Sequence, residues 1–156
     1  MDAFRFSELT KNEIPEIAKF GTLLNPDKSV QELSTLLEKM FRMENYNCFG
    51  LFKSDDLLAV SSGWVTVRFY SGKQLEVDNV VVLENYRSQG IGTILFDHIE
   101  NWAIKNDCNT VELNTFLKNT RSHNFYENRD YEALGYHYVK KLNGFNRTFH
   151  AEMDKK

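Results

Sequence analysis

The residues best suited to chemistry stand at a strand-to-helix turn, in the sequence VDNVVVLENYRSQGIGTIL from Val77 to Leu95. An apolar run leads into a turn with Gly90 and Gly92, and a helical pattern follows. The first amides of a helix have no intrahelical partner, and the helix dipole adds about half a positive charge there. Since glycine lets the backbone approach an anion closely, this pattern indicates a phosphate-binding turn.

Two common nucleotide motifs do not fit this turn. A Walker loop requires Gly-Lys followed by Ser or Thr, whereas Gly92 is followed by Thr93 and Ile94. A dinucleotide fingerprint requires a third small residue where this chain has Leu95, and an acidic residue about 20 positions further on. The phosphate ligand is therefore of another kind, unless the glycines serve packing alone.

Two carboxylates precede the turn. Glu76 and Asp78 are two residues apart, so they are expected on the same face of a strand. A neighbouring carboxylate and partial burial both raise the pKa of a carboxyl group, which makes it a better base toward an amine of pKa about 10.4. The alternative for either residue is a structural role at the strand edge or a partnership with a cation.

The elements that must position these residues follow from local patterns. Capping boxes at Thr10–Glu13 and Ser29–Glu32 predict two helices after a first strand near the N-terminus. Further helices are expected from residue 91 to about 105 and, capped by Asn119 or Thr120, through residue 127. Further strands are expected at 46–53, 57–70, 75–83, 110–116, 132–142 and 147–153. The order β-α-α-β-β-β-α-β-α-β-β predicts an α/β (α+β) fold with a mixed sheet of about seven strands and about four flanking helices.

Two segments resemble motifs of the GNAT superfamily of N-acetyltransferases. The turn at 87–92 is similar to its acetyl-CoA pyrophosphate loop, and NTRSHNFYE at 119–127 looks like its Asn-x-x-Ala-x-x-Phe-Tyr-Glu segment. The element order matches the fold of that family over almost the whole chain. Two departures stand out: Ser88 and Gln89 replace a common Gly and a cation, and Asp130 replaces a Gly after the helix through residue 127.

The resemblance implies an N-acetyltransferase that moves an acetyl group from acetyl-CoA to a primary amine by direct attack in a ternary complex. It implies Tyr126 as general acid, Glu76 or Asp78 as general base, and the amide of Val81 or Val82 as the oxyanion donor. Helix packing is the alternative role of Tyr126. The residues expected to contact CoA are Val80, Val81, Val82, Arg87, Ser88, Gln89, Gly90, Ile91, Gly92, Thr93, Asn119, Ser122 and Tyr126.

The acceptor is left open among a small-molecule amine, a polyamine, an amino sugar and a protein amine. A non-catalytic CoA-binding regulatory or interaction module and a transferase of longer acyl groups are the alternatives. A homodimer is plausible for the family, although nothing in the sequence tests it.

Composition narrows the remaining choices. The chain has 156 residues and a net charge of -3, without a basic run that would indicate a nucleic-acid partner. It has no apolar run of membrane-spanning length and a polar N-terminus, so we expect no membrane partner and a cytoplasmic protein. Cys48 and Cys108 are expected to be reduced, no metal site is expected, and residues 1–156 are expected to form one acetyltransferase domain.

Overall fold

The computed structural model describes residues 4–147. The chain divides into two compact units, residues 1–113 and residues 114–156. The first unit contains a sheet with helices on both faces, and the described part of the second contains one helix.

The first unit is built on a five-stranded sheet in the order β1-β2-β3-β4-β5. All neighbours are antiparallel except β4 and β5, which are parallel, as is usual for two strands joined by a helical crossover. The strands are rich in the β-branched and aromatic residues that favour a pleated, half-buried surface. They are β1 (Phe4–Leu9), β2 (Tyr46–Lys53), β3 (Asp56–Arg68), β4 (Gly72–Val82) and β5 (Thr110–Leu113).

The helices begin where the capping signals place them. Thr10 and Glu13 form a capping box before the short helix η1 (Lys11–Glu13), which leads into α1 (Ile14–Leu24). Ser29 and Glu32 form a second capping box at the start of α2 (Val30–Met40). Each box satisfies backbone amides that the helix itself cannot. Both capping-box predictions are therefore confirmed. The other helices among the described residues are η2 (Glu84–Tyr86), α3 (Ile91–Lys105) and α4 (Thr120–Glu127).

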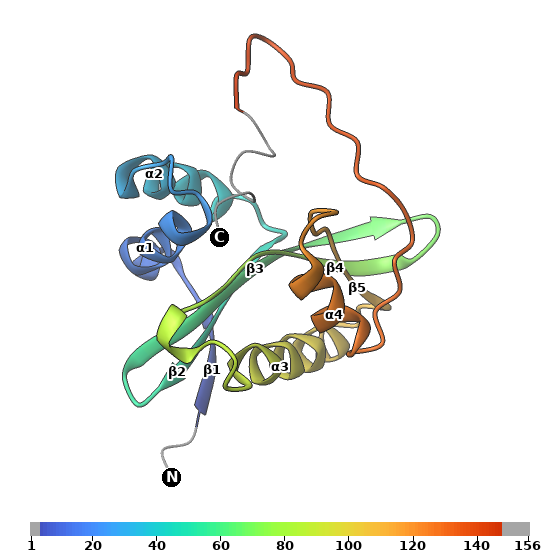
Figure 1. The fold of residues 1–156 in the computed structure, drawn as a ribbon, viewed down its shortest axis with the longest axis horizontal. Coiled ribbons are helices and arrows are strands. Elements are labelled where there is room, and N and C mark those ends of the chain that lie inside the picture. The colour runs from blue at the N-terminus through green and yellow to red at the C-terminus, as the bar shows by residue number, and fades with distance from the viewer. Residues whose placement is uncertain (1–3, 148–156) are drawn as a thin grey trace. The chain divides into compact units, whose positions relative to one another are not determined.

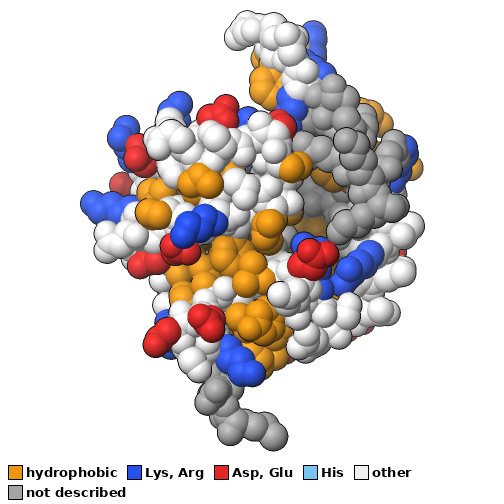
Figure 2. Space-filling view, turned by 60° about the vertical axis from the view of Figure 1, so that its left-hand side comes forward, with side chains coloured by type: hydrophobic (Ala, Val, Ile, Leu, Met, Phe, Trp, Pro, Cys, Tyr) orange, Lys and Arg blue, Asp and Glu red, His pale blue; other side chains and the backbone are white. Residues whose placement is uncertain are grey.

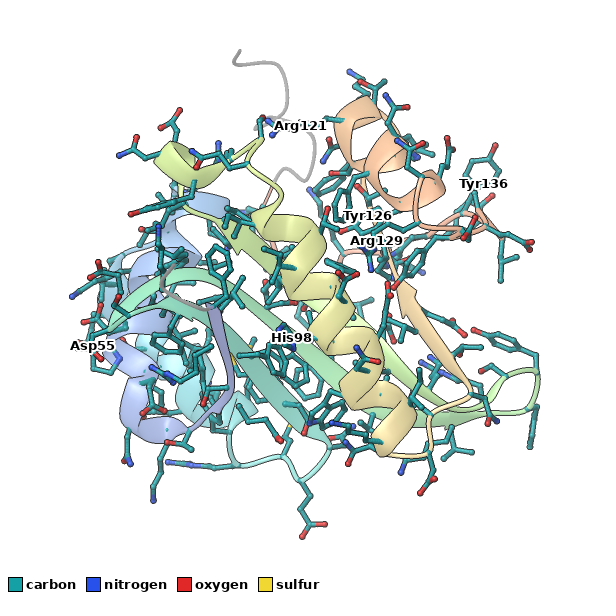
Figure 3. All side chains as sticks on the ribbon, turned by 90° about the horizontal axis from the view of Figure 1, so that it is seen from below. Asp55, His98, Arg121, Tyr126, Arg129 and Tyr136 are labelled. Atoms are coloured by element: carbon teal, nitrogen blue, oxygen red, sulfur yellow. The ribbon has the colours of Figure 1, made fainter. Side chains whose placement is uncertain are left out.

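Helices cover both faces of the sheet in the first unit (Figure 1). Buried side chains of α1 and α2 form one cluster with residues of β2, β3 and β4. On the opposite face, the Trp102 ring of α3 lies 5.0 Å from the ring of Phe49. His98, also on α3, stacks on Phe6 with 4.9 Å between ring centroids (Figure 3). The sheet is thus held between two layers that bury its apolar side chains.

The strand count of about seven is a correction, because the described residues form five strands. Strand β5 ends at Leu113 instead of residue 116, and residues 132–142 form no strand. Leu134, Tyr136 and Tyr138 in that segment are exposed. The pattern supplied strand propensity, but a strand also requires a neighbour for its backbone groups, and the segment pairs with none of the described residues. The last expected strand, 147–153, lies outside the described residues except for Arg147.

The face shown in Figure 2 carries no patch of a single charge among the residues drawn in colour. Lys and Arg side chains alternate with Asp and Glu side chains on the face shown in Figure 2. None of the helices among residues 4–147 combines the length and the apolar character that a membrane crossing requires.

Candidate active site

Strand β4 contains a bulge next to Asp78. A two-residue step in β3 is matched by the three-residue step from Asp78 to Val81, so β4 carries one extra residue. Asn79 lies in this step with φ +52°, a left-handed conformation that Asn tolerates better than most residues. The extra residue resets the strand alternation, so Glu76 and Asp78 share a face with Val81.

Beyond the bulge, β4 has an open edge. Strand β5 pairs with β4 only from Gln74 to Val77, and within residues 4–113 no strand continues along that side. The amide of Leu83 donates to the carbonyl of Leu58 in β3 at 3.0 Å. Because strand amides alternate in direction, the Val82 amide faces the open edge and the Val81 amide faces β3. Of the two amides expected to stabilise an oxyanion, the geometry favours Val82.

The two carboxylates of β4 have different partners. Glu76 Oε2 lies 3.6 Å from Arg68 Nη2, and the Glu76 side chain is 32% exposed. Asp78 is exposed, and its carboxylate accepts hydrogen bonds from Asn79, from the backbone N at 2.8 Å and from Nδ2 at 3.2 Å. Glu76 is therefore paired with a side-chain cation, whereas Asp78 caps the bulge.

A third carboxylate, Glu112 of β5, was missed by the sequence analysis. It lies directly opposite Glu76 in the parallel pairing of β4 and β5, so both side chains project from the same face. Its two oxygens accept hydrogen bonds from the Tyr70 hydroxyl at 2.5 Å and the Thr110 hydroxyl at 3.0 Å. The bond to Glu112 raises the pKa of the exposed Tyr70. The signal available beforehand was the parallel pairing of two segments with an acidic residue in each.

The turn after β4 is held by side-chain contacts to the backbone. Arg87 Nε donates to the Val82 carbonyl at 3.0 Å, and Gln89 Nε2 donates to the Asn85 carbonyl at 2.7 Å. Two residues in the turn have left-handed conformations, Ser88 at φ +60° and Gly90 at φ +79°. Gly90 is the N-cap of α3, so its glycine is required by the backbone path into the helix.

The start of α3 presents unused amides. The first amide that bonds within the helix is that of Ile94, which donates to the Gly90 carbonyl at 3.0 Å. The amides of Gly90, Ile91 and Gly92 have no acceptor among the described residues. Such amides at a helix N-terminus are the groups that hold a phosphate. Thr93 lies in the same first turn.

In the second unit, Asn119 caps α4. Its Oδ1 accepts a hydrogen bond from the Ser122 amide at 3.2 Å, which confirms the expected cap. The ring nitrogen Nε2 of His123 lies 3.0 Å from the Phe116 carbonyl. The cap and the His123 contact explain these side chains structurally, and the expected contacts of Asn119 and Ser122 with CoA stay predictions.

Tyr126 lies on α4 (Figure 3), where burial raises its pKa to about 12. Its ring packs against those of Phe125 and Tyr131, with centroids 5.2 and 5.7 Å away. After the helix, Asp130 adopts φ +62°, so it takes a left-handed conformation in spite of its side chain. Tyr126 is thus a protonated phenol at neutral pH, held by aromatic neighbours.

Among residues 4–147, no three His, Cys, Asp or Glu side chains lie together as metal ligands would. Cys48 and Cys108 are both free thiols. Burial raises the pKa of Cys48 to about 12, so it is an unreactive core thiol at neutral pH.

Comparison with known proteins finds acetyltransferases at the level of family, sequence and structure. The sequence model of the "Acetyltransferase (GNAT) family" matches residues 17–131. An uncharacterized N-acetyltransferase of Bacillus subtilis, YhdJ, is 26% identical over 115 residues, which cover 74% of this chain and 78% of the relative. A possible acetyltransferase from Clostridium difficile matches with TM-score 0.78 and 19% identity, over 90% of this chain and 97% of its own. The structure of an aminoglycoside N-acetyltransferase, AAC(6')-Iy, in complex with CoA matches with TM-score 0.79 and 12% identity. The match covers 90% of this chain and 95% of the chain of that enzyme.

Proposed function

We propose that this chain, which belongs to the acetyltransferase (GNAT) family, transfers an acetyl group from acetyl-CoA to a primary amine. One observation carries the proposal: the open edge of β4 leads into a helix start where the amides of Gly90, Ile91 and Gly92 have no acceptor among the described residues. A pantetheine arm can pair with a strand edge as an extra strand, and a diphosphate fits a helix N-terminus. The two features together match the two parts of CoA.

The residues of the first unit have separate tasks in the proposed reaction. Glu76 or Asp78, directly or through water, takes a proton from the ammonium group so that the neutral amine can attack the thioester carbonyl. The new C–N bond places negative charge on the carbonyl oxygen, and the Val82 amide at the open edge donates a hydrogen bond to it. The C–S bond then breaks, CoA leaves as a thiolate, and the attached nitrogen loses its remaining extra proton, so that the acetyl group stays on the amine as a neutral amide.

Tyr126 is proposed to give its phenolic proton to the departing thiolate. A phenol of pKa about 12 is protonated throughout the neutral range and donates a hydrogen bond to a sulfur anion. Proton transfer from this phenol to a thiolate of pKa about 8.5 is uphill. Tyr126 therefore donates a hydrogen bond to the sulfur while the C–S bond breaks, and the proton that it gives up is replaced by the one released from the product nitrogen. We also propose that the two compact units serve one reaction, because the family match spans residues 17–131 and continues across their boundary.

We propose a cationic amine as acceptor, because Glu76 and Glu112 project from one face of adjacent strands. Charge complementarity favours a substrate with more than one ammonium group, such as an amino sugar or a polyamine, over a neutral amine. The aminoglycoside N-acetyltransferase named above has the same fold, which makes amino sugars a reasonable first choice. Amino acids and protein amines belong in the same panel.

The test is release of free CoA thiol from acetyl-CoA with a panel of amines, combined with calorimetric titration of CoA. Saturable turnover with a cationic amine supports the proposal. Saturable CoA binding without turnover on any amine favours a non-catalytic CoA-binding module. Turnover only with longer acyl-CoA donors favours the transferase of longer acyl groups, and no CoA binding by folded protein contradicts all three.

A further inference from the structure

The bulge of β4 is held by Ser61, Ser62 and Asn79, which no proposed reaction step uses, together with Asp78. Ser62 of β3 is 1% exposed, and its hydroxyl lies 3.4 Å from the Asp78 carbonyl. Ser61 is 0% exposed, and its hydroxyl lies 3.3 Å from the same carbonyl. Asn79 Nδ2 donates to Ser62 Oγ at 3.2 Å and to Asp78 Oδ2 at 3.2 Å. Polar groups buried in a sheet are costly unless they bond, so this network has a definite structural purpose.

The purpose follows from the strand alternation. A shift of one residue reverses the direction of every amide and side chain beyond it. With the extra residue at Asn79, the Val82 amide faces the open edge of β4 and Val81 faces the α1 and α2 side. Without it, the Val82 amide would turn toward β3. The bulge therefore decides which amide is presented at the open edge.

We propose that Ser62, Asp78 and Asn79 are positioning residues for the acetyl transfer: they lock the bulge that presents the Val82 amide to the thioester oxygen. This inference rests on the proposed function above. It also assigns different roles to the two carboxylates of β4, because the Asp78 carboxylate already accepts hydrogen bonds from Asn79 N and Nδ2. Asp78 then belongs to the bulge lock, which consists of Ser62, Asp78 and Asn79 together. Glu76 is the residue that receives the proton of the amine.

Single substitutions separate backbone conformation from side-chain bonding. Asn79→Gly keeps φ +52° accessible without strain, whereas Asn79→Ala does not. Left-handed strain corresponds to a factor of about 5–30 in an equilibrium constant. We therefore expect kcat to fall in the order wild type, Asn79→Gly, Asn79→Ala, with the last about tenfold or more below wild type, while the Kd of CoA changes less than twofold.

The matched control is Thr66→Val on the same face of β3. The Thr66 hydroxyl is buried and has no partner among the described residues, so its removal breaks no hydrogen bond. We expect wild-type kcat for this variant. For Ser62→Ala we expect a kcat about 5- to 30-fold lower, because the Ser62 hydroxyl makes two neutral hydrogen bonds. Equal kcat for the two variants would overturn the role of Ser62.

The role of Asp78 is tested by the pH profile of kcat/KM. Asp78→Asn keeps one acceptor oxygen for the Asn79 amide, so we expect a smaller loss than for Asp78→Ala and an unchanged acidic limb. Glu76→Gln is expected to abolish that limb. Loss of the limb in Asp78→Asn would identify Asp78 as the base and overturn its assignment to the bulge lock.

Amide hydrogen exchange measured by NMR tests the bulge lock without any activity. We expect the Leu83 amide, which bonds to β3, to exchange about tenfold faster in Asn79→Ala than in Thr66→Val, because a strained bulge opens more often. Equal exchange rates would contradict the bulge lock. If the wild-type protein transfers no acetyl group to any amine, the proposed function fails, and the exchange rates still decide whether the bulge lock exists.

Discussion

The substitution Gly90→Ala tests the turn that we propose for the diphosphate. Gly90 has φ +79° and ψ 0°, and a Cβ built on it meets no atom within 4 Å. The new methyl group therefore clashes with nothing, and the whole cost is that of a left-handed alanine, about 1–2 kcal/mol. This backbone conformation sets the direction in which the amide N–H groups of Gly90, Ile91 and Gly92 point.

The strain can be expressed in two ways that are measured separately. If the turn keeps its shape, the folded state carries the cost, and the Tm falls by about 2–8 °C. If the turn relaxes, stability is preserved but the amides rotate away, and the Kd of CoA rises about 5- to 30-fold. The loss of folding free energy and the loss of binding free energy should add up to about 1–2 kcal/mol.

Thermal unfolding and calorimetric titration with CoA provide both quantities on the same protein. Ser88→Gly is the matched control, because Ser88 in the same turn already has φ +60° and glycine relieves that strain. We expect Ser88→Gly to be as stable as wild type or more stable. A Gly90→Ala variant with unchanged Tm and unchanged Kd would refute the assigned turn conformation.

Three further predictions follow from other parts of the chain. Tyr126→Phe should lower kcat about 10- to 100-fold with the Kd of CoA within twofold, as measured by thiol release and calorimetry; an unchanged kcat would leave Tyr126 a packing residue. Burial raises the pKa values of Cys48 and Tyr46 above 9 and 10 in the folded protein, so the folded state holds these protons more tightly than the unfolded chain. The free energy of unfolding should therefore be insensitive to these groups below pH 9 and fall between about pH 9 and 12 in denaturant titrations, less steeply in Tyr46→Phe; an identical slope would contradict that source. Ser29→Ala removes the cap of α2 and should lower the free energy of unfolding by about 1 kcal/mol in the same titrations, whereas Ser34→Ala inside that helix should change it little.

Local rules were sufficient for the elements whose signals lie within a few residues. The capping boxes at Thr10 and Ser29 need only three residues each, and both formed as predicted. The glycine turn and the start of α3 are likewise a short-range pattern. The prediction of a strand at 132–142 was wrong for the opposite reason. Strand propensity is a local property, whereas the neighbouring strand that must accept and donate the hydrogen bonds lies elsewhere in the sequence.

The amino-acid sequence by itself determined the family, the order of most elements, the turn before α3 and the shared face of Glu76 and Asp78, because these depend on spacing along the chain. Only the tertiary structure decided that Asn79 forms a bulge, that Val82 rather than Val81 faces the open edge, and that Glu112 lies beside Glu76. Each of these depends on the register between strands, which is set by side chains far apart in the sequence packing on two faces of one sheet. A one-residue shift in register would leave the composition of every strand unchanged, but it would reverse the faces on which its side chains lie and the edges toward which its amides point.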